Sequence, residues 1–216
     1  YDNFSMDFFN NIEKNNNRYS ILFEKASLYL EKLFELIQLL ELDKNSIILV
    51  LSDHGVSIGE KIGECAYGAF CYDYTIKTFS YIQIPGIKPD VILKQVRHID
   101  FLPTILDMLE ITKDKSFSEI DGKSLLPLIN KQYYTENVAF SETCNPLKEK
   151  RPPKIPNIKS VRTSDWKLIL NEYNNSKELY NISNDPLEEE NLIDQKLEIE
   201  LDLWNEFLKI QEKSLV

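Results

Sequence analysis

The chain has 216 residues, of which 43% are hydrophobic and 28% charged, and its formal net charge is -10 at pH 7. This composition excludes a disordered chain and predicts a globular protein with one substantial core. The acidic balance argues against a nucleic-acid surface or an anionic membrane surface, although a bound cation would still allow an anionic substrate to bind.

No stretch of the sequence approaches the uninterrupted apolar length that a membrane span needs. The three cysteines, Cys65, Cys71 and Cys144, are too few and too irregularly spaced for a disulfide framework or a zinc knuckle, so reduced and mostly packed thiols are expected. Because the chain opens at Tyr1 without an initiator methionine, we expect a piece of a longer protein. Its polar start, including Asn15–Asn17, is expected to be a surface loop.

Apolar residues recur at helical spacing from Tyr19 to Leu42, with charged residues between them, which predicts a long amphipathic helix. The apolar run at 47–51 is rich in β-branched residues and is typical of a central strand that is covered on both faces. A helix followed by a buried strand indicates an α/β layer. The residues Ser52, Asp53, His54 and Gly55 come directly after this strand.

Asp53 and His54 are the candidate metal ligands. In open α/β sheets, functional residues gather beyond the carboxyl ends of the strands, where this pair lies. A carboxylate oxygen and an imidazole nitrogen suit Mg²⁺, Ca²⁺, Mn²⁺ or Zn²⁺, depending on the other ligands. The alternative is that Asp53 caps the following turn and His54 is an ordinary surface histidine. These four residues alone do not separate the two interpretations.

The segment after His54 holds four of the six glycines, at positions 55, 59, 63 and 68, which indicates a tightly folded functional loop rather than a flexible one. A second strand is predicted at 78–84 and a short helix at 101–109, capped by Asp100. His98 has no neighbouring acidic or cysteine cluster, so it is interpreted as a structural or surface histidine. Another short apolar helix is expected near 125–129.

The last third of the chain follows a proline-rich linker at 151–156. Strands are predicted at 160–163, at 166–173 and near 179–182, which together indicate a small antiparallel sheet. The residues from Asp185 to Glu188 have the pattern of a helix start, so a final helix is expected from about Glu189 into the low 210s. These elements predict two domains, residues 1–150 and residues 151–216.

Several of these segments match known motifs in their order along the chain. They are Ser-Asp-His-Gly at 52–55, Gly59-Glu60, Tyr-Asp-Tyr-Thr-Ile-Lys at 72–77, Ile-Asp-Phe-Leu-Pro-Thr at 99–104, Asp-Gly-Lys-Ser-Leu at 121–125, Glu-Leu-Tyr-Asn at 178–181 and Asp-Pro-Leu-Glu at 185–188. Each piece is weak alone, but in this order they resemble the C-terminal half of the sulfatase family, within the alkaline phosphatase-like superfamily.

The resemblance implies an α/β fold, in which residues 1–150 form part of an alkaline phosphatase-like sheet flanked by helices. Residues 151–216 would form a small antiparallel sheet packed with a terminal helix. By resemblance, Asp53 and His54 hold a divalent cation, usually calcium or magnesium in this family. The nucleophile, a formylglycine in sulfatases, would belong to a missing N-terminal half, so no catalytic nucleophile is expected in this chain. The implied activity is hydrolysis of a small-molecule or glycan sulfate ester.

Two alternatives stay open. One is a phosphodiester or phosphonate monoester hydrolase of the same superfamily, and the other is a non-catalytic, split or decayed sulfatase-like module. The sequence also departs from the family at Gly68, where a lysine usually contacts the sulfate or the leaving group. Lys61 could replace this contact by folding back, or it could be a solvated loop lysine.

A sequence near Cys144 echoes the Cys-x-Pro-x-Arg signature from which formylglycine is made. It lies on the wrong side of Asp53, however, and Lys148 stands where the signature has arginine. We therefore interpret Cys144 as a loop cysteine.

Overall fold

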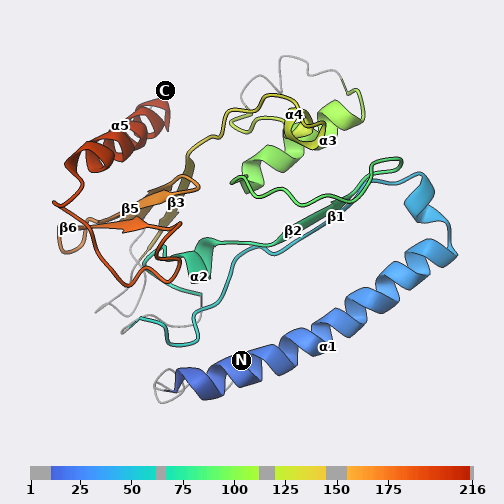
Figure 1. The fold of residues 1–216 in the computed structure, drawn as a ribbon, viewed down its shortest axis with the longest axis horizontal. Coiled ribbons are helices and arrows are strands. Elements are labelled where there is room, and N and C mark those ends of the chain that lie inside the picture. The colour runs from blue at the N-terminus through green and yellow to red at the C-terminus, as the bar shows by residue number, and fades with distance from the viewer. Residues whose placement is uncertain (1–10, 62–66, 112–119, 145–154, 215–216) are drawn as a thin grey trace. The chain divides into compact units, whose positions relative to one another are not determined.

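The computed structural model describes residues 11–61, 67–111, 120–144 and 155–214 (Figure 1). The chain divides into two compact units. The first unit comprises residues 1–89 and 143–158, and the second comprises residues 90–142 and 159–216. These units differ from the two segments 1–150 and 151–216, and that sequence-based division stays a prediction.

The first unit opens with the long helix α1 (Ile12–Leu39). Its first residues were expected to be a surface loop, and that prediction is wrong. The side chain of Asn11 caps the helix by accepting a hydrogen bond of 2.9 Å from the backbone N–H of Lys14. Asn15 is buried, and its amide donates a 2.8 Å hydrogen bond to the carbonyl oxygen of Ile58. The cap and this tertiary contact outweigh the low helix propensity of the asparagines.

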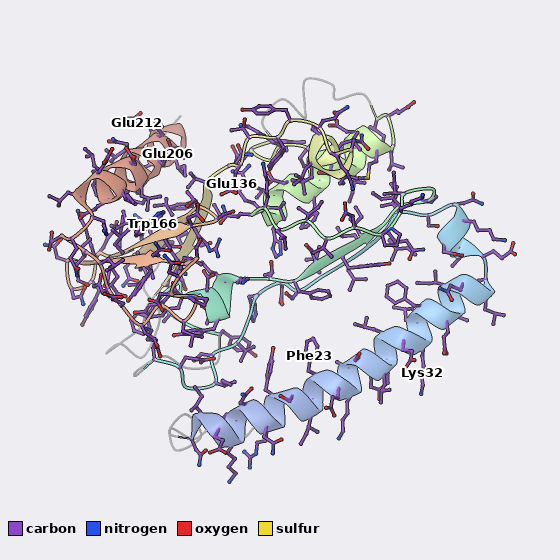
Figure 2. All side chains as sticks on the ribbon, viewed as in Figure 1. Phe23, Lys32, Glu136, Trp166, Glu206 and Glu212 are labelled. Carbon is purple, nitrogen blue, oxygen red and sulfur yellow. The ribbon has the colours of Figure 1, made fainter. Side chains whose placement is uncertain are left out.

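Helix α1 presents apolar side chains that the described residues leave uncovered. The exposed fractions are 64% for Leu22, 76% for Tyr29 and 49% for Leu36. Phe23 is exposed as well, and Figure 2 shows it projecting from the helix. One internal contact is made by Phe34, whose ring lies edge-on to Tyr81 with the centroids 5.7 Å apart.

A 3-10 turn η2 (Leu42–Lys44) leads from α1 into β1 (Ile48–Leu51), which pairs antiparallel with β2 (Ser80–Gln83). In this register Ile48 lies opposite Gln83 and Leu51 opposite Ser80. The short helix α2 (Asp73–Ile76) lies between the strands in sequence. Both strands lie where the sequence predicts them, and the mixed α/β class is confirmed. Among the described residues, however, β1 pairs with β2 alone and is half-buried rather than covered on both faces, and a larger alkaline phosphatase-like sheet is not seen.

The second unit begins with the 3-10 turn η3 (His98–Asp100), helix α3 (Phe101–Met108) and helix α4 (Leu126–Ile129). Both helices lie where the sequence predicts them. The capping role expected for Asp100 is confirmed for η3, where its carboxylate accepts a 3.0 Å hydrogen bond from the backbone N–H of Arg97, but its side chain makes no cap bond to α3. Instead, its buried carboxylate accepts hydrogen bonds from the guanidinium of Arg97 at 2.7 Å and from the backbone N–H of Lys123 at 2.9 Å. A buried carboxylate needs such partners to offset its lost hydration.

The small sheet contains β3 (Ala139–Thr143), β4 (Ile158–Arg162), β5 (Trp166–Asn171) and β6 (Ser176–Asn181), in that order. The sequence predicts the last three of these strands but not β3. Helix α5 (Leu197–Ser214) packs on the sheet. The shared core is formed by buried apolar side chains from both layers: Val161, Leu168, Leu170, Leu179, Leu203 and Phe207. The expected antiparallel sheet with a terminal helix is therefore confirmed.

The start of the final helix was predicted wrongly. Helix α5 begins at Leu197 rather than near Glu189. Glu188 has a left-handed backbone with φ of 56°, and its buried carboxylate lies 2.8 Å from the ammonium group of the buried Lys167. The Asp185 carboxylate accepts hydrogen bonds from the backbone N–H groups of Glu189 and Glu190. Residues 185–188, which the sequence predicts as a helix start, thus form a turn, and this turn places the Glu188 carboxylate beside the Lys167 ammonium of β5.

Candidate metal centre

The candidate site lies in the first unit, where the chain leaves β1. Ser52 and Phe79 exchange two hydrogen bonds of 3.0 Å, one between backbone groups and one from the Phe79 N–H to the Ser52 hydroxyl. These bonds extend the ladder of the two strands by one position. Asp53 and His54 therefore follow a fixed strand end, as the sequence predicts.

Gly55 anchors the loop to α2. Its backbone N–H donates a 2.8 Å hydrogen bond to the carbonyl oxygen of Thr75. A Cβ at this position would overlap the carbonyl oxygen of Tyr74 and would lie 3.0 Å from its carbonyl carbon. Glycine is needed here because two backbones approach closely.

The His54 ring is oriented by its neighbours in the loop. Its Nδ1 lies 2.6 Å from the carbonyl oxygen of Gly55, and since a carbonyl can only accept, Nδ1 carries the proton. In the neutral ring the lone pair is then on Nε2. That atom lies 3.6 Å from Oδ2 of Asp53, while Oδ1 of Asp53 accepts a 2.9 Å hydrogen bond from the His54 backbone N–H.

The electrostatics of this pair suit a cation. The Nε2 lone pair and the carboxylate oxygen are both electron-rich, so a cation placed between them would be attracted by both. Metal–ligand distances of roughly 2.0 to 2.6 Å place two neighbouring ligand atoms roughly 3 to 4 Å apart. The separation of 3.6 Å between Nε2 and Oδ2 fits one shared cation.

Both side chains are accessible from solvent. The exposed fraction is 87% for the Asp53 side chain and 39% for that of His54. The described residues contain no group of three or more His, Cys, Asp or Glu side chains that could hold a metal ion. What the described part of the chain offers is a pair of ligands.

The loop after the pair is folded by Glu60. Its carboxylate accepts hydrogen bonds from the backbone N–H of Ile58 at 2.7 Å, from that of Gly59 at 3.1 Å and from the hydroxyl of Ser57 at 3.0 Å. The bond from Asn15 to Ile58 ties this turn to α1. The prediction of a tightly folded loop is confirmed for residues 55–61, and residues 62–66, which include Gly63, lie outside the described residues.

Lys61 contacts an aromatic group at the end of the loop. The ammonium group of Lys61 lies over the ring of Tyr72, 4.9 Å from the centroid, and Tyr72 stacks on Tyr74 at 5.6 Å. The Lys61 head group is therefore engaged in a cation–π contact. Its role as a substrate contact stays a prediction.

The ring of Tyr67 lies perpendicular to that of His54, with an interplanar angle of 89° and centroids 5.2 Å apart. The sequence places Tyr67 among aromatics near the loop but assigns it no role. The only signal for Tyr67 in the sequence is its position beside Gly68. In the structure Gly68 has a φ of 74°, a backbone conformation that favours glycine.

Among the other sequence candidates, His98 and Cys144 lie apart from this loop in the chain. His98 is exposed, and its ring is tilted against Phe101 at 6.1 Å between centroids, which agrees with a surface or structural role. Cys71 is buried and Cys144 is partly buried, while Cys65 lies outside the described residues. None of the described helices is long and apolar enough to cross a membrane.

Two family models match the chain. One is described as N-sulphoglucosamine sulphohydrolase, C-terminal, and matches residues 67–213; the other is described as Sulfatase and matches residues 6–111. Together, the two matches extend from residue 6 to residue 213.

One sequence relative and two solved structures are similar to the chain over most of its length. The chain is 27% identical over 173 residues to the choline-sulfatase of Rhizobium meliloti (strain 1021), a match that covers 79% of this chain and 32% of that protein. Its fold is similar to that of a Bacteroides thetaiotaomicron protein from a locus for the metabolism of multiple glycosaminoglycans, with a TM-score of 0.67, 22% identity and coverage of 82% and 39%. It is also similar to a phosphonate monoester hydrolase from Silicibacter pomeroyi, with a TM-score of 0.66, 19% identity and coverage of 86% and 38%. The chain thus spans about a third to two fifths of the length of these proteins.

Proposed function

The chain belongs to the sulfatase family, and we propose that it is the C-terminal portion of a metal-dependent sulfate ester hydrolase. In this proposal Asp53 and His54 are two of the ligands of a divalent cation, with Ca²⁺ first and Mg²⁺, Mn²⁺ or Zn²⁺ as alternatives. The remaining ligands and the formylglycine nucleophile come from the amino-terminal portion of the enzyme. A larger alkaline phosphatase-like sheet around β1 and β2 belongs to the same proposal.

One feature of the loop carries the proposal: Nδ1 of His54 is engaged by Gly55, and Nε2 faces the Asp53 carboxylate at 3.6 Å. A cation bound by these atoms would neutralise charge on the ester and stabilise the charge that develops in the transition state. The chain's own contribution is to hold both ligand atoms at the end of β1. The bond from Gly55 to Thr75 keeps that end in place.

The substrate proposed is a small-molecule or glycan sulfate ester. A choline-sulfatase among the relatives and a glycosaminoglycan-locus protein among the structural neighbours support this class. The similarity to a phosphonate monoester hydrolase supports the second candidate, hydrolysis of a phosphonate monoester or phosphodiester. The same charge neutralisation serves both chemistries, so assays with an aryl sulfate and an aryl phosphate have to separate them.

The chain has two histidines, and each lies in a different unit, which makes a direct test of the ligand pair simple. Titration of the chain with Mn²⁺, followed by NMR of the histidine ring protons, should broaden the His54 resonance and leave that of His98 sharp. Even weak binding by two ligands is visible, because the paramagnetic ion relaxes nearby protons strongly. The Asp53→Asn variant should lose most of this broadening. Equal broadening of both histidines, or none, would overturn the ligand assignment.

An activity assay tests the rest of the proposal. The 216-residue chain alone should show no robust, EDTA-sensitive turnover of an aryl sulfate or an aryl phosphate, because its nucleophile is proposed to lie elsewhere. Such turnover would show that the nucleophile is in this chain. In an active enzyme that includes the amino-terminal portion, Asp53→Ala or His54→Ala should reduce the rate severely.

A further inference from the structure

Tyr67 is the aromatic side chain that meets His54. The two rings are perpendicular, at 89°, and their centroids are 5.2 Å apart, which is the edge-to-face arrangement that aromatic pairs prefer. The Tyr67 residue is 57% exposed. A ring that exposed contributes little to a buried core.

The His54 side chain has two torsions that must be held for Nε2 to face Asp53. The hydrogen bond from Nδ1 to the carbonyl oxygen of Gly55 restrains the ring within its own loop segment. That bond joins neighbouring residues, and 39% of the His54 side chain is exposed, so solvent competes for it. The Tyr67 ring comes from a later part of the loop and restrains the imidazole from a second direction.

We propose that Tyr67 is a positioning residue that holds the His54 imidazole with Nε2 toward the Asp53 carboxylate. This inference rests on the proposed role of His54 as a metal ligand. Groups that orient a ligating histidine influence metal affinity even though they do not touch the ion. Tyr67 does so through its ring rather than through a hydrogen bond to Nδ1, since Nδ1 is engaged by Gly55.

The size of the effect follows from the strength of an edge-to-face pair. Such a pair stabilises a protein to an extent that corresponds to about a 2-fold to 10-fold change in an equilibrium constant. Tyr67→Ala should therefore raise the Mn²⁺ concentration needed for half-maximal broadening of His54 by about 2-fold to 10-fold. Tyr67→Phe keeps the ring and should behave like the wild type.

The orientation itself can be observed without metal. In the wild-type chain we expect nuclear Overhauser contacts between the ring protons of Tyr67 and His54, and a ¹⁵N pattern in which Nδ1 carries the proton of the neutral ring. Tyr67→Ala should change the chemical shift of the His54 ring protons through loss of the ring current. Tyr67→Phe should preserve that shift, and the His98 resonance should not move in either variant. Tyr133→Ala, which removes a 91% exposed aromatic side chain from the other unit, is the matched control and should leave His54 unchanged.

The outcomes separate this inference from the proposed function. If Mn²⁺ broadens His54 in the wild type, and Tyr67→Ala changes neither the His54 shift nor the Mn²⁺ dependence, Tyr67 does not position the ligand and the inference is wrong. If Tyr67→Phe fails as badly as Tyr67→Ala, the hydroxyl rather than the ring is responsible, and the inference is also wrong. If Mn²⁺ leaves His54 sharp in the wild type while the nuclear Overhauser contact is present, the proposed metal role fails, and the inference of ligand positioning fails with it.

Discussion

Replacing Gly55 by alanine should detach the Asp53–His54 loop from α2. The added Cβ would overlap the Tyr74 carbonyl oxygen and would lie 3.0 Å from its carbonyl carbon and 3.4 Å from Cα of Thr75. All three atoms belong to the backbone, so no side-chain rotation relieves the overlap. The loop has to move away, and this movement breaks the 2.8 Å hydrogen bond from Gly55 to Thr75.

The expected cost has two parts. Overpacking costs about 1 to 3 kcal/mol, and loss of the hydrogen bond costs about 0.5 to 1.5 kcal/mol. Gly55→Ala should therefore lower the free energy of unfolding of the first unit by about 2 to 4 kcal/mol. Gly86 provides a matched control in the same unit, because its φ is 79° and no atom lies within 4 Å of the position a Cβ would take. Gly86→Ala should cost about 1 to 2 kcal/mol, through backbone strain alone.

Urea unfolding followed by the two histidine ring resonances measures both effects, since His54 reports on the first unit and His98 on the second. Gly55→Ala should shift the His54 resonance in the folded state and lower its unfolding midpoint, with His98 unchanged. Gly86→Ala should lower the midpoint less and leave the folded-state His54 shift as in the wild type. If Gly55→Ala keeps the wild-type His54 shift and unfolds no earlier than Gly86→Ala, the close approach of the two backbones does not hold the loop.

Three ion pairs of the second unit provide further tests. Lys167→Met leaves the Glu188 carboxylate buried without its counter-ion and should lower the free energy of unfolding by about 3 to 5 kcal/mol, measured by urea unfolding with tryptophan fluorescence. Adding Glu188→Leu should restore part of the loss. A loss under about 1 kcal/mol for the single variant would contradict the buried pair. Asp100→Asn removes the charge that pairs with the largely buried guanidinium of Arg97 and should lower the free energy of unfolding by about 3 kcal/mol, measured by urea unfolding followed at the His98 resonance. An unfolding midpoint equal to that of the wild type would show that the pair is dispensable. The hydrogen bond from the Lys131 ammonium lowers the pKa of Asp90 below its ordinary value, so this exposed pair stabilises the fold above the ordinary aspartate pKa and loses that effect as the pH falls through the lowered pKa. Thermal unfolding of Asp90→Asn should therefore differ slightly from the wild type at neutral pH and low salt and converge with it in acid and in high salt; a difference that grows in acid would refute the assignment.

Prediction from sequence succeeded where one periodic pattern dominates. The continuous apolar run before Ser52 predicted β1, and the alternating and apolar segments of the last third predicted the sheet under α5. Position along the chain also predicted that Asp53 and His54 follow a strand end directly. These features depend on neighbours in sequence, which local patterns report well.

Prediction failed where a distant residue decides the local structure. Asn15 was predicted to lie in a loop but is helical and buried, because its side-chain amide donates a hydrogen bond to the carbonyl oxygen of Ile58. Glu188 reads as a helix cap but lies in a turn, because Lys167 on a neighbouring strand needs a counter-ion. Asp100 reads as a cap of α3, yet its carboxylate caps the preceding turn η3 and also binds the guanidinium of Arg97 and the backbone N–H of Lys123.

The sequence by itself indicated the family, the strands β1, β2, β4, β5 and β6 and the two candidate ligands, because the pattern for each lies in residues that are close together in the chain. Only the tertiary structure decided which nitrogen of His54 is available, how near it comes to the Asp53 carboxylate and that Tyr67 borders the ring. The physical reason is that these properties depend on distances between backbones and rings that packing sets. The same holds for Gly55: only glycine fits at this position, because the backbone of α2 lies where a Cβ would be.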